Sequence, residues 1–299
     1  MNRIPIIIDT DLGDDVDDAA ALIMALNSPE LDIVGITTVY RDTRKRVRMV
    51  KDICRLAGRE DIPVIAGRAS GIMDNQPNRE EPLQYEAYEF LDLQTDEPYR
   101  ESDAARFILD RVKSTADLMI VGMGMMTNLA LAFLMEPETM RNSRIVAMGG
   151  MFDAPVPEWN LKCDPYGARI VMDQAVNLIM FGLEVTKHLK LSDEKMQMLC
   201  PAENKMMQHY LKGVRCFREK TGFTVTLHDA VLIAYLVRPE IAKLKRCDFT
   251  AEITGDLTKG SVYKQINGYD LEQVFHKQFY YAESVSTEEF MNLVGERLR

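Results

Sequence analysis

Long apolar runs are absent from this chain of 299 residues. No window of about 18 residues is apolar throughout, and the N-terminus lacks the pattern of a signal peptide. We therefore expect a cytoplasmic protein with no membrane span. The 46% of hydrophobic residues can form a large core. Because no linker, repeat or low-complexity tract divides the sequence, we predict a single domain over residues 1–299.

Cysteines are few and widely spaced, and acidic residues outnumber basic residues. The five cysteines stand at positions 54, 163, 200, 216 and 247 without a C-x-x-C pair, which argues against a zinc site or a disulfide framework and predicts reduced thiols. The net charge of −10 argues against nucleic acid or an anionic membrane as a partner. The basic run from Arg41 to Lys51 is an exception, and we expect it to form a solvated helix face.

Basic residues are missing altogether between Arg3 and Arg41, and this gap holds a dense group of acids. Like charges packed together raise one another's pKa, and a bound cation is the simplest compensation. Oxygen ligands favour Ca²⁺ or Mg²⁺ over zinc or copper. Helix capping needs only one or two acids, and an EF-hand is unsuitable because its twelfth position, counted from Asp9, is Ala20 and not Glu. The six aspartates, which fall within ten residues, are Asp9, Asp11, Asp14, Asp15, Asp17 and Asp18.

The acidic cluster lies between a strand pattern at 4–8 and a helix pattern at 17–27. Similar alternation continues along the chain and predicts an α/β fold with an open, mostly parallel, Rossmann-like sheet flanked by helices. In such sheets ligands bind at the carboxyl ends of the strands, which is where the cluster lies. The further strands are expected at 32–38, 63–66, 117–123, 144–148 and 177–183, and the further helices at 43–57, 102–114, 127–134, 165–173 and 192–199.

The rest of the chain is less regular. Residues 68–100 predict a long irregular segment, which in a compact domain tends to be functional. Residues 200–245 are expected to be helical, with an interruption near Gly213 and Gly222. An alternating pattern over 247–265 predicts a hairpin, and a last helix is expected to start at Ser286, capped together with Glu289.

Two polar motifs lie far from the cluster in sequence. His228 and Asp229 open an apolar helix, so His228 is a candidate proton donor, although a helix cap beside a surface histidine has the same pattern. Glu158 and Asn160 are expected on one side of an extended segment, where both could hydrogen-bond a polyol. The only tryptophan, Trp159, is expected to pack in the interior, and Asp164 before Pro165 predicts a helix cap.

These motifs together resemble the inosine–uridine preferring nucleoside hydrolases. That family opens with D-x-D-x-G-x-D-D-A-x-A-L, and the chain carries this pattern from Asp9 to Leu22 with two extra residues after Gly13. Further matches occur in the family's order over most of the chain. They are residues 35–38, 126–129, 148–150, 158–160 with 164–165, 183–186 and 228–229.

The resemblance implies a Ca²⁺-dependent enzyme that hydrolyses the N-glycosidic bond of a purine or pyrimidine ribonucleoside and releases ribose and free base. It also implies a role in nucleoside salvage and a homodimer or homotetramer. The implied metal ligands are Asp11, Asp18, Asp229 and the main-chain carbonyl of Met123. The implied general base for a water on the metal is Asp11, the group that assists base departure is His228, and the ribose contacts are Asp17, Glu158 and Asn160.

The chain departs from the family on the side of the base. Asp42 is the expected replacement for an asparagine that usually follows the 35–38 strand, which makes it a candidate substrate contact. A second usual asparagine is missing near Phe152, and residues 83–86 replace a His-Gly segment. Asp14 and Asp15 belong to the insertion, and Asp9 is expected to support the loop from behind. The aromatic candidates for stacking on the base, which could equally pack in the core, are Tyr85, Phe217 and Phe223.

Three alternatives stay open at the level of sequence. The enzyme could cleave another ribosyl compound, because the base-side residues diverge. It could be a phosphohydrolase of the haloacid dehalogenase type with Asp9 as nucleophile, although Gly13 breaks the D-x-D-x-[TV] signature. It could also be a sugar- or nucleoside-binding protein that kept the metal site and lost turnover.

Overall fold

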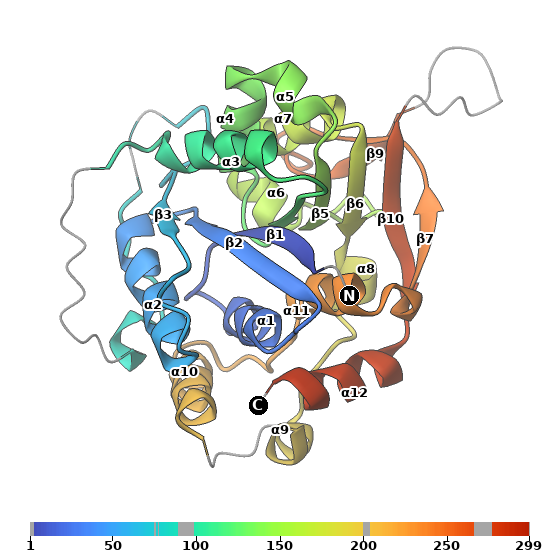
Figure 1. Ribbon diagram of the computed structural model, residues 1–299. Coiled ribbons are helices and arrows are strands. Elements are labelled where there is room, and N and C mark those ends of the chain that lie inside the picture. The colour runs from blue at the N-terminus through green and yellow to red at the C-terminus, as the bar shows by residue number, and fades with distance from the viewer. Residues whose placement is uncertain are drawn as a thin grey trace.

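An eight-stranded sheet runs through the computed structural model, in the order β3-β2-β1-β4-β5-β6-β10-β7 (Figure 1). The structure describes residues 3–74, 76, 78–88, 99–199, 204–265 and 277–298. All neighbouring strands of this sheet are parallel except β10 and β7, so the predicted α/β class is confirmed. The strands are β1 (Ile4–Thr10), β2 (Leu31–Thr38), β3 (Val64–Ala66), β4 (Met119–Gly122), β5 (Arg144–Met148), β6 (Asn177–Phe181), β7 (Ala242–Arg246) and β10 (Gln278–Val285).

Helices cover both faces of the sheet, because successive side chains of a buried strand point to opposite faces. In β1, Ile6 and Ile8 pack into one hydrophobic cluster and Ile7 packs into the other. The first cluster takes in α1 (Asp17–Leu26), α2 (Thr43–Leu56), α11 (Ala230–Val237) and α12 (Thr287–Arg297). The second takes in α3 (Asp103–Ser114), α4 (Thr127–Met135) and α7 (Pro165–Gln174). The other helices are α5 (Pro137–Arg141), α6 (Trp159–Cys163), α8 (Leu183–Thr186), α9 (Asp193–Leu199) and α10 (Lys205–Thr221), with short 3₁₀ turns at Tyr85–Ala87 and Pro239–Ile241.

The strand order reverses beside β1. The chain passes from β1 to β2 and β3 on one side, and then continues on the other side with β4, β5 and β6. The helices that follow β1 and β4, α1 and α4, therefore pack on opposite faces of the sheet. Such a switch point is where open α/β sheets bind ligands. The acidic loop follows β1 and Met123 follows β4, so the fold places both sequence motifs at this point.

Two strands were not predicted. β7 was expected to be helical, and β10 had no assignment. β7 has the sequence AKLKR and forms an edge of the sheet, with Lys243, Lys245 and Arg246 exposed. Charged side chains are common on edge strands, where they discourage pairing with other chains. Its extended form depends on pairing with β10, which no local pattern indicates.

The remaining elements agree in part with expectation. The hairpin of β8 (Phe249–Ala251) and β9 (Val262–Lys264) is antiparallel, as predicted. Ser286 caps α12 by accepting a hydrogen bond from the Glu289 N–H. Gly213, however, lies inside α10 and does not interrupt it, whereas Gly222 ends that helix with a φ of 71°. Residues 75, 77 and 89–98 of the predicted irregular segment lie outside the described residues.

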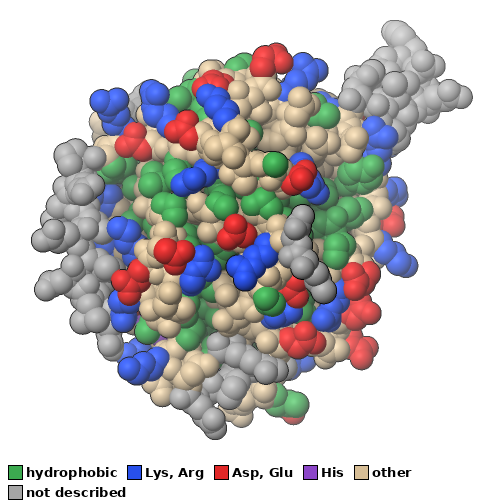
Figure 2. Space-filling model, viewed as in Figure 1, with side chains coloured by type: hydrophobic (Ala, Val, Ile, Leu, Met, Phe, Trp, Pro, Cys, Tyr) green, Lys and Arg blue, Asp and Glu red, His purple; other side chains and the backbone are tan. Residues whose placement is uncertain are grey.

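Acidic and basic side chains are interspersed over the face shown in Figure 2, and the atoms drawn in colour there form no continuous basic patch. In the part of the chain that the structure describes, none of the helices has the length and apolar character needed to cross a bilayer.

Candidate active site

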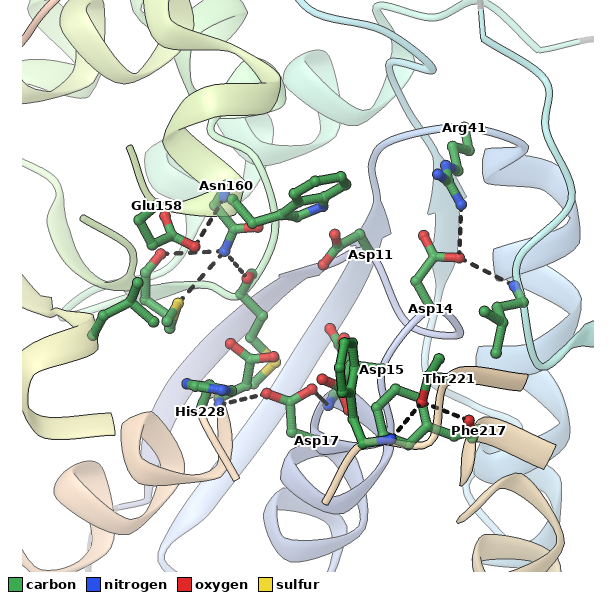
Figure 3. Close-up of a pocket in the computed structure, with 18 of the residues that line it drawn as sticks. Asp11, Asp14, Asp15, Asp17, Arg41, Glu158, Asn160, Phe217, Thr221 and His228 are labelled. Carbon is green, nitrogen blue, oxygen red and sulfur yellow. Dashed lines mark hydrogen bonds and ion pairs between the residues drawn. The ribbon is translucent and has the colours of Figure 1, made fainter. Parts of the chain in front are cut away.

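A cavity of about 480 Å³ opens above the carboxyl ends of β1 and β4 (Figure 3). Five of the six clustered aspartates line it, and Asp9 does not. Segments far apart in the sequence complete its walls, including the loop before α6 and the start of α11. The other lining residues are Arg41, Leu83, Met123, Met148, Pro157, Glu158, Trp159, Asn160, Leu183, Phe217, Thr221, Phe223, His228 and Asp229.

Three buried carboxylates meet at the bottom of this cavity. Oxygen atoms of Asp17, Asp18 and Asp229 lie within 4.8 Å of one another. Asp17 accepts hydrogen bonds from the N–H groups of Asp18, at 3.1 Å, and of Asp229, at 3.2 Å. The Thr10 hydroxyl donates to Asp18. Oδ1 of Asp229 is buried without a hydrogen-bond partner, which is costly for a carboxylate oxygen unless another group binds it.

The raised pKa values of the clustered carboxylates indicate a site that favours a bound cation. Burial raises the pKa of Asp11 from 3.8 to about 7 and that of Asp17 to about 6. Burial, and then repulsion by neighbouring aspartates, raises the pKa of Asp18 and Asp229 well above 3.8. A divalent cation would reverse these shifts, because it stabilises the ionised carboxylates. The donors are hard oxygens, which suit Ca²⁺ or Mg²⁺.

Met123 brings a main-chain carbonyl to the same place. Its N–H donates to the carbonyl of Asp9 at 2.7 Å, which fixes the loop after β4 against β1. Its carbonyl accepts a hydrogen bond from the side-chain amide of Asn160 at 2.6 Å. A carbonyl oxygen has two lone pairs, so one remains for a further partner. The structure thus brings Met123 and Asn160 together with the aspartates, as the sequence led us to expect.

Glu158 is held rigidly at the opposite wall. It is the N-cap of α6 and accepts hydrogen bonds from the N–H groups of Gly150, Asn160 and Leu161 at 2.9–3.2 Å. The expectation that Glu158 and Asn160 share an extended segment is wrong, because α6 begins at Trp159. A capping carboxylate satisfies the free N–H groups of the first helical turn, and here this fixes the side chain at the cavity wall.

His228 approaches the cavity from the start of α11. Its Nδ1 lies 2.8 Å from the hydroxyl of Thr186 in α8. Burial lowers the pKa of the His228 side chain, and the nearby Asp15 and Glu158 oppose this shift. The imidazole is therefore positioned by one ring nitrogen, which leaves the other for a ligand. Thr186 falls in one of the quoted motifs, but the sequence alone did not indicate that it orients His228.

Asp9 supports the site from behind. Its Oδ1 accepts hydrogen bonds from the Thr37 hydroxyl at 2.6 Å and the Asn128 amide at 2.8 Å. These bonds tie the end of β1 to β2 and α4. Asp9 is buried and does not face the cavity, in keeping with the supporting role expected of it.

Comparison with known proteins identifies the family. The model of the inosine-uridine preferring nucleoside hydrolase family matches residues 6–292. The chain belongs to this family. A non-specific ribonucleoside hydrolase, RihC, of Salmonella paratyphi C (strain RKS4594) is 33% identical over 279 residues, which cover 88% of each chain. Membership makes the protein an N-glycosyl hydrolase of ribonucleosides and argues against a phosphohydrolase of the haloacid dehalogenase type.

Solved structures agree on the fold of this nucleoside hydrolase. The plant nucleoside hydrolase PpNRh1 superposes with a TM-score of 0.86 at 23% identity, over 99% of both chains. The purine-preferring ribonucleoside hydrolase from Gardnerella vaginalis gives a TM-score of 0.82 at 24% identity, over 98% of both chains. At these identities the likeness concerns the fold.

Arg46 is a residue of this nucleoside hydrolase whose role the sequence did not indicate. The basic run was expected to be solvated, yet Arg46 is fully buried under the acidic loop. Its guanidinium donates to the carbonyls of Tyr40, Asp11 and Leu12, and to the carboxylate of Asp14 at 2.6 Å. The burial of Arg46 could have been predicted from its position in α2, because it lies on the same face of the helix as the apolar residues Val50 and Ile53.

Asp42 and Trp159 lie elsewhere than expected. Asp42 caps α2 by accepting a hydrogen bond from the Lys45 N–H at 3.1 Å and does not line the cavity, whereas its neighbour Arg41 does. Trp159 is 56% exposed at the cavity wall, so the expectation that it packs in the interior is wrong. Asp164 caps α7, as predicted, through the Gly167 N–H at 2.9 Å.

Of the three aromatic candidates for stacking on the base, two line the cavity and one does not. Phe217 and Phe223 line the cavity of the nucleoside hydrolase, and Phe223 is 69% exposed. Tyr85 is not among the lining residues, and its hydroxyl accepts a hydrogen bond from Arg48 at 3.2 Å. Phe223 is therefore available to a base in the cavity, whereas Phe217 borders the cavity but is buried in the hydrophobic core.

Proposed function

We propose that this nucleoside hydrolase uses Ca²⁺ to hydrolyse the N-glycosidic bond of purine and pyrimidine ribonucleosides, releasing ribose and free base. The observation that carries the proposal is the group of buried carboxylates at the switch point, in which Asp229 presents an oxygen without a partner. The broad choice of base is supported by the Salmonella relative, whose name describes it as non-specific.

The proposed ligands of the cation are Asp11, Asp18, Asp229 and the carbonyl of Met123. The side chain of Asp17 lies close to those of Asp18 and Asp229, but both its oxygens already accept hydrogen bonds from backbone N–H groups. We assign Asp17 to the ribose hydroxyls on the family resemblance, since each of its oxygens keeps a lone pair that can accept a further hydrogen bond. When bound, Ca²⁺ would orient the ribose hydroxyls and lower the pKa of a nearby water.

The side chains around the sugar supply the remaining chemistry. Asp11 accepts the proton of the attacking water as general base. Asp17, Glu158 and Asn160 hold the ribose hydroxyls, and fixing the sugar in this way orients it for attack. Bond cleavage passes through an oxocarbenium-like ribosyl group, whose positive charge the surrounding carboxylates stabilise.

His228 assists the leaving base. If the Thr186 hydroxyl donates to Nδ1, the proton of the neutral imidazole lies on Nε2 and is available to the base. A donor there stabilises the negative charge that develops on the base as the bond breaks.

The cellular setting is proposed from the family alone. We propose a homodimer or homotetramer that acts in cytoplasmic nucleoside salvage, with no nucleic acid or membrane partner. Light scattering on the purified chain measures the subunit number. A monomer at working concentrations would contradict the assembly and leave the chemistry untouched.

Variants of single aspartates test the metal site and the base. We expect Asp229→Asn to lose bound Ca²⁺, measured by elemental analysis, together with turnover. We expect Asp11→Asn to lower kcat by about 10²- to 10⁴-fold, the usual contribution of a general base. Asp42→Asn is the matched control, because Asp42 is a neighbouring aspartate outside the cavity, and it should keep both Ca²⁺ and turnover. Near-normal turnover in Asp11→Asn would contradict the mechanism.

A further inference from the structure

The two inserted residues are fixed in place by the segment around residue 84. The side-chain amide of Gln84 donates to the main-chain carbonyl of Asp15 at 2.6 Å, and its N–H donates to the carbonyl of Gly13 at 2.8 Å. The Leu83 N–H donates to the carboxylate of Asp14 at 3.1 Å. The insertion is therefore bonded to a second segment of the chain, and its side chains have defined directions.

The two inserted carboxylates differ in what they contact. Asp14 is neutralised by the buried guanidinium of Arg46, at 2.6 Å, and by Arg41, at 3.3 Å. Asp15 lines the cavity, and within the described residues it forms no ion pair with an arginine or lysine, although the side chain of His228 is nearby. Oδ1 of Asp15 accepts a hydrogen bond from the N–H of the next residue, Val16, at 2.6 Å. Within the described residues its Oδ2 has no protein partner, so Asp15 presents a free acceptor to whatever enters.

Asp15 lies on the same side of the cavity as Asp17 and the end of α10, across from Glu158 and Asn160 (Figure 3). Phe217, Thr221 and Phe223, at the end of α10, line the same cavity. Lys220 joins this end of α10 to the Leu83 carbonyl at 2.8 Å, so the insertion, the segment near residue 84 and α10 form one connected wall. In Figure 3, Asp15 is drawn on the side of Thr221 and Phe217, and Glu158 and Asn160 are drawn across the pocket.

We infer that Asp15 is a specificity-determining residue for the base: its carboxylate accepts a hydrogen bond from a ring or exocyclic N–H of the nucleobase. The inference rests on the proposed function, because a ribose held by Glu158 and Asn160 on one side of the cavity leaves the side of Asp15, Phe217 and Phe223 to the base. Burial, and then the nearby Asp17, raises the pKa of Asp15 to about 7. Above that pH a base that offers an N–H satisfies the carboxylate, whereas a base with a lone pair at that position faces an unpaired charge. The site therefore selects nucleosides whose base carries a donor on that edge.

Inosine and purine riboside test this inference, because they share the ribose and the purine ring but only inosine has the N1–H donor. The quantity measured is the ratio of kcat/KM for the two nucleosides, in which effects common to both cancel. We expect Asp15→Ala to lower the preference for inosine about 10- to 100-fold relative to the unaltered enzyme, as for a hydrogen bond to a charged group. Asp15→Asn, which keeps the shape of the side chain, should lower it less.

Asp14→Asn is the matched control, because it alters the same loop at a carboxylate bound to arginine. It is expected to change kcat/KM for both nucleosides by the same factor and to leave their ratio unchanged. An unchanged ratio in both Asp15 variants, with equal losses on the two substrates, would reduce Asp15 to a structural residue and overturn the inference. Failure of the proposed function is a separate result, since the unaltered enzyme would then release ribose from neither nucleoside.

Discussion

Arg46 shows how one buried side chain makes the acidic loop compatible with folding. Its guanidinium is fully buried and binds three carbonyls and the carboxylate of Asp14. A buried charge is tolerated when its hydrogen-bond partners are in place. Removing one partner leaves the other buried groups without compensation for their charge. The loop therefore depends on a cation supplied by the protein itself as well as on the proposed Ca²⁺.

We expect Arg46→Met to lower the free energy of unfolding by about 3–5 kcal/mol, because the loop carbonyls lose their donor and Asp14 loses the nearer of its two arginines. Lys45→Met is the control on the same helix, since Lys45 forms a partly exposed ion pair with Glu81. Such pairs contribute about 0–1 kcal/mol. Urea unfolding measures both variants, and equal losses would show that the burial of Arg46 has no special role.

At single residues the sequence predicted chemistry better than burial. The residues that line the cavity include five of the aspartates, Glu158, Asn160 and His228. They could be recognised from the sequence because polar residues of these types are unusual between apolar strands and helices. The burial of Trp159 and Arg46 was predicted wrongly, because the average burial of tryptophan or arginine does not decide an individual case. The pairing of Thr186 with His228 joins α8 to α11, and no local pattern indicates such a contact.

At the level of elements, the loops after β1 and β4 must approach each other closely. A Cβ atom added at Gly124 would lie 2.7 Å from Cγ1 of Val39 and 2.9 Å from Oδ1 of Asp11, closer than carbon side chains tolerate. Glycine at this position therefore lets the β4 loop lie directly against the proposed general base.

We expect Gly124→Ala to displace Asp11 and to lower kcat/KM by about 10²-fold, the usual consequence of moving a catalytic group by about 1 Å. Gly122→Ala, at the end of β4 just before this loop, is the control. A Cβ there would make only an ordinary contact at 3.5 Å with Ala147. The comparison uses steady-state kinetics on inosine. Equal activity of the two variants would mean that the close approach does not control the site.

Elements with strong internal patterns were predictable and elements that depend on distant partners were not. The strands β1, β2, β4 and β5 are apolar runs with a helix after each, and their positions agree with expectation to within a few residues. β10 pairs with β6 and β7, so the extended form of β7, with the sequence AKLKR, depends on a partner that is distant in the sequence. Short helices such as α6 and α8 are likewise held by contacts at the site and not by length.

At the scale of the whole molecule, cation binding and stability should be linked. The folded pKa of Asp11, about 7, and that of Asp17, about 6, lie above the ordinary 3.8. Without a cation such groups stabilise the fold at low pH, and this contribution is lost as the pH rises through their folded pKa values. A cation that binds the ionised forms restores the loss and competes with protons.

We therefore expect the stabilisation by saturating Ca²⁺ to grow as the pH rises from about 5 to about 7.5. At a concentration of about 100 times Kd it should reach about 2.7 kcal/mol in the free energy of unfolding. Urea unfolding with Ca²⁺ and with a chelator, repeated across this range, measures the difference. A stabilisation that is the same at every pH would contradict the linkage.

The central claim is that the carboxylates at the switch point form a Ca²⁺ site for ribonucleoside hydrolysis. The most direct measurement is the release of reducing sugar from a panel of nucleosides by the purified enzyme, first as prepared, then after chelation, and then after Ca²⁺ is restored. The account predicts release of ribose as prepared, loss of about 10²-fold or more on chelation, since a bound metal ion contributes several kcal/mol to such a reaction, and recovery with Ca²⁺. Unchanged ribose release by fully chelated enzyme, with elemental analysis confirming that no metal remains, would contradict it.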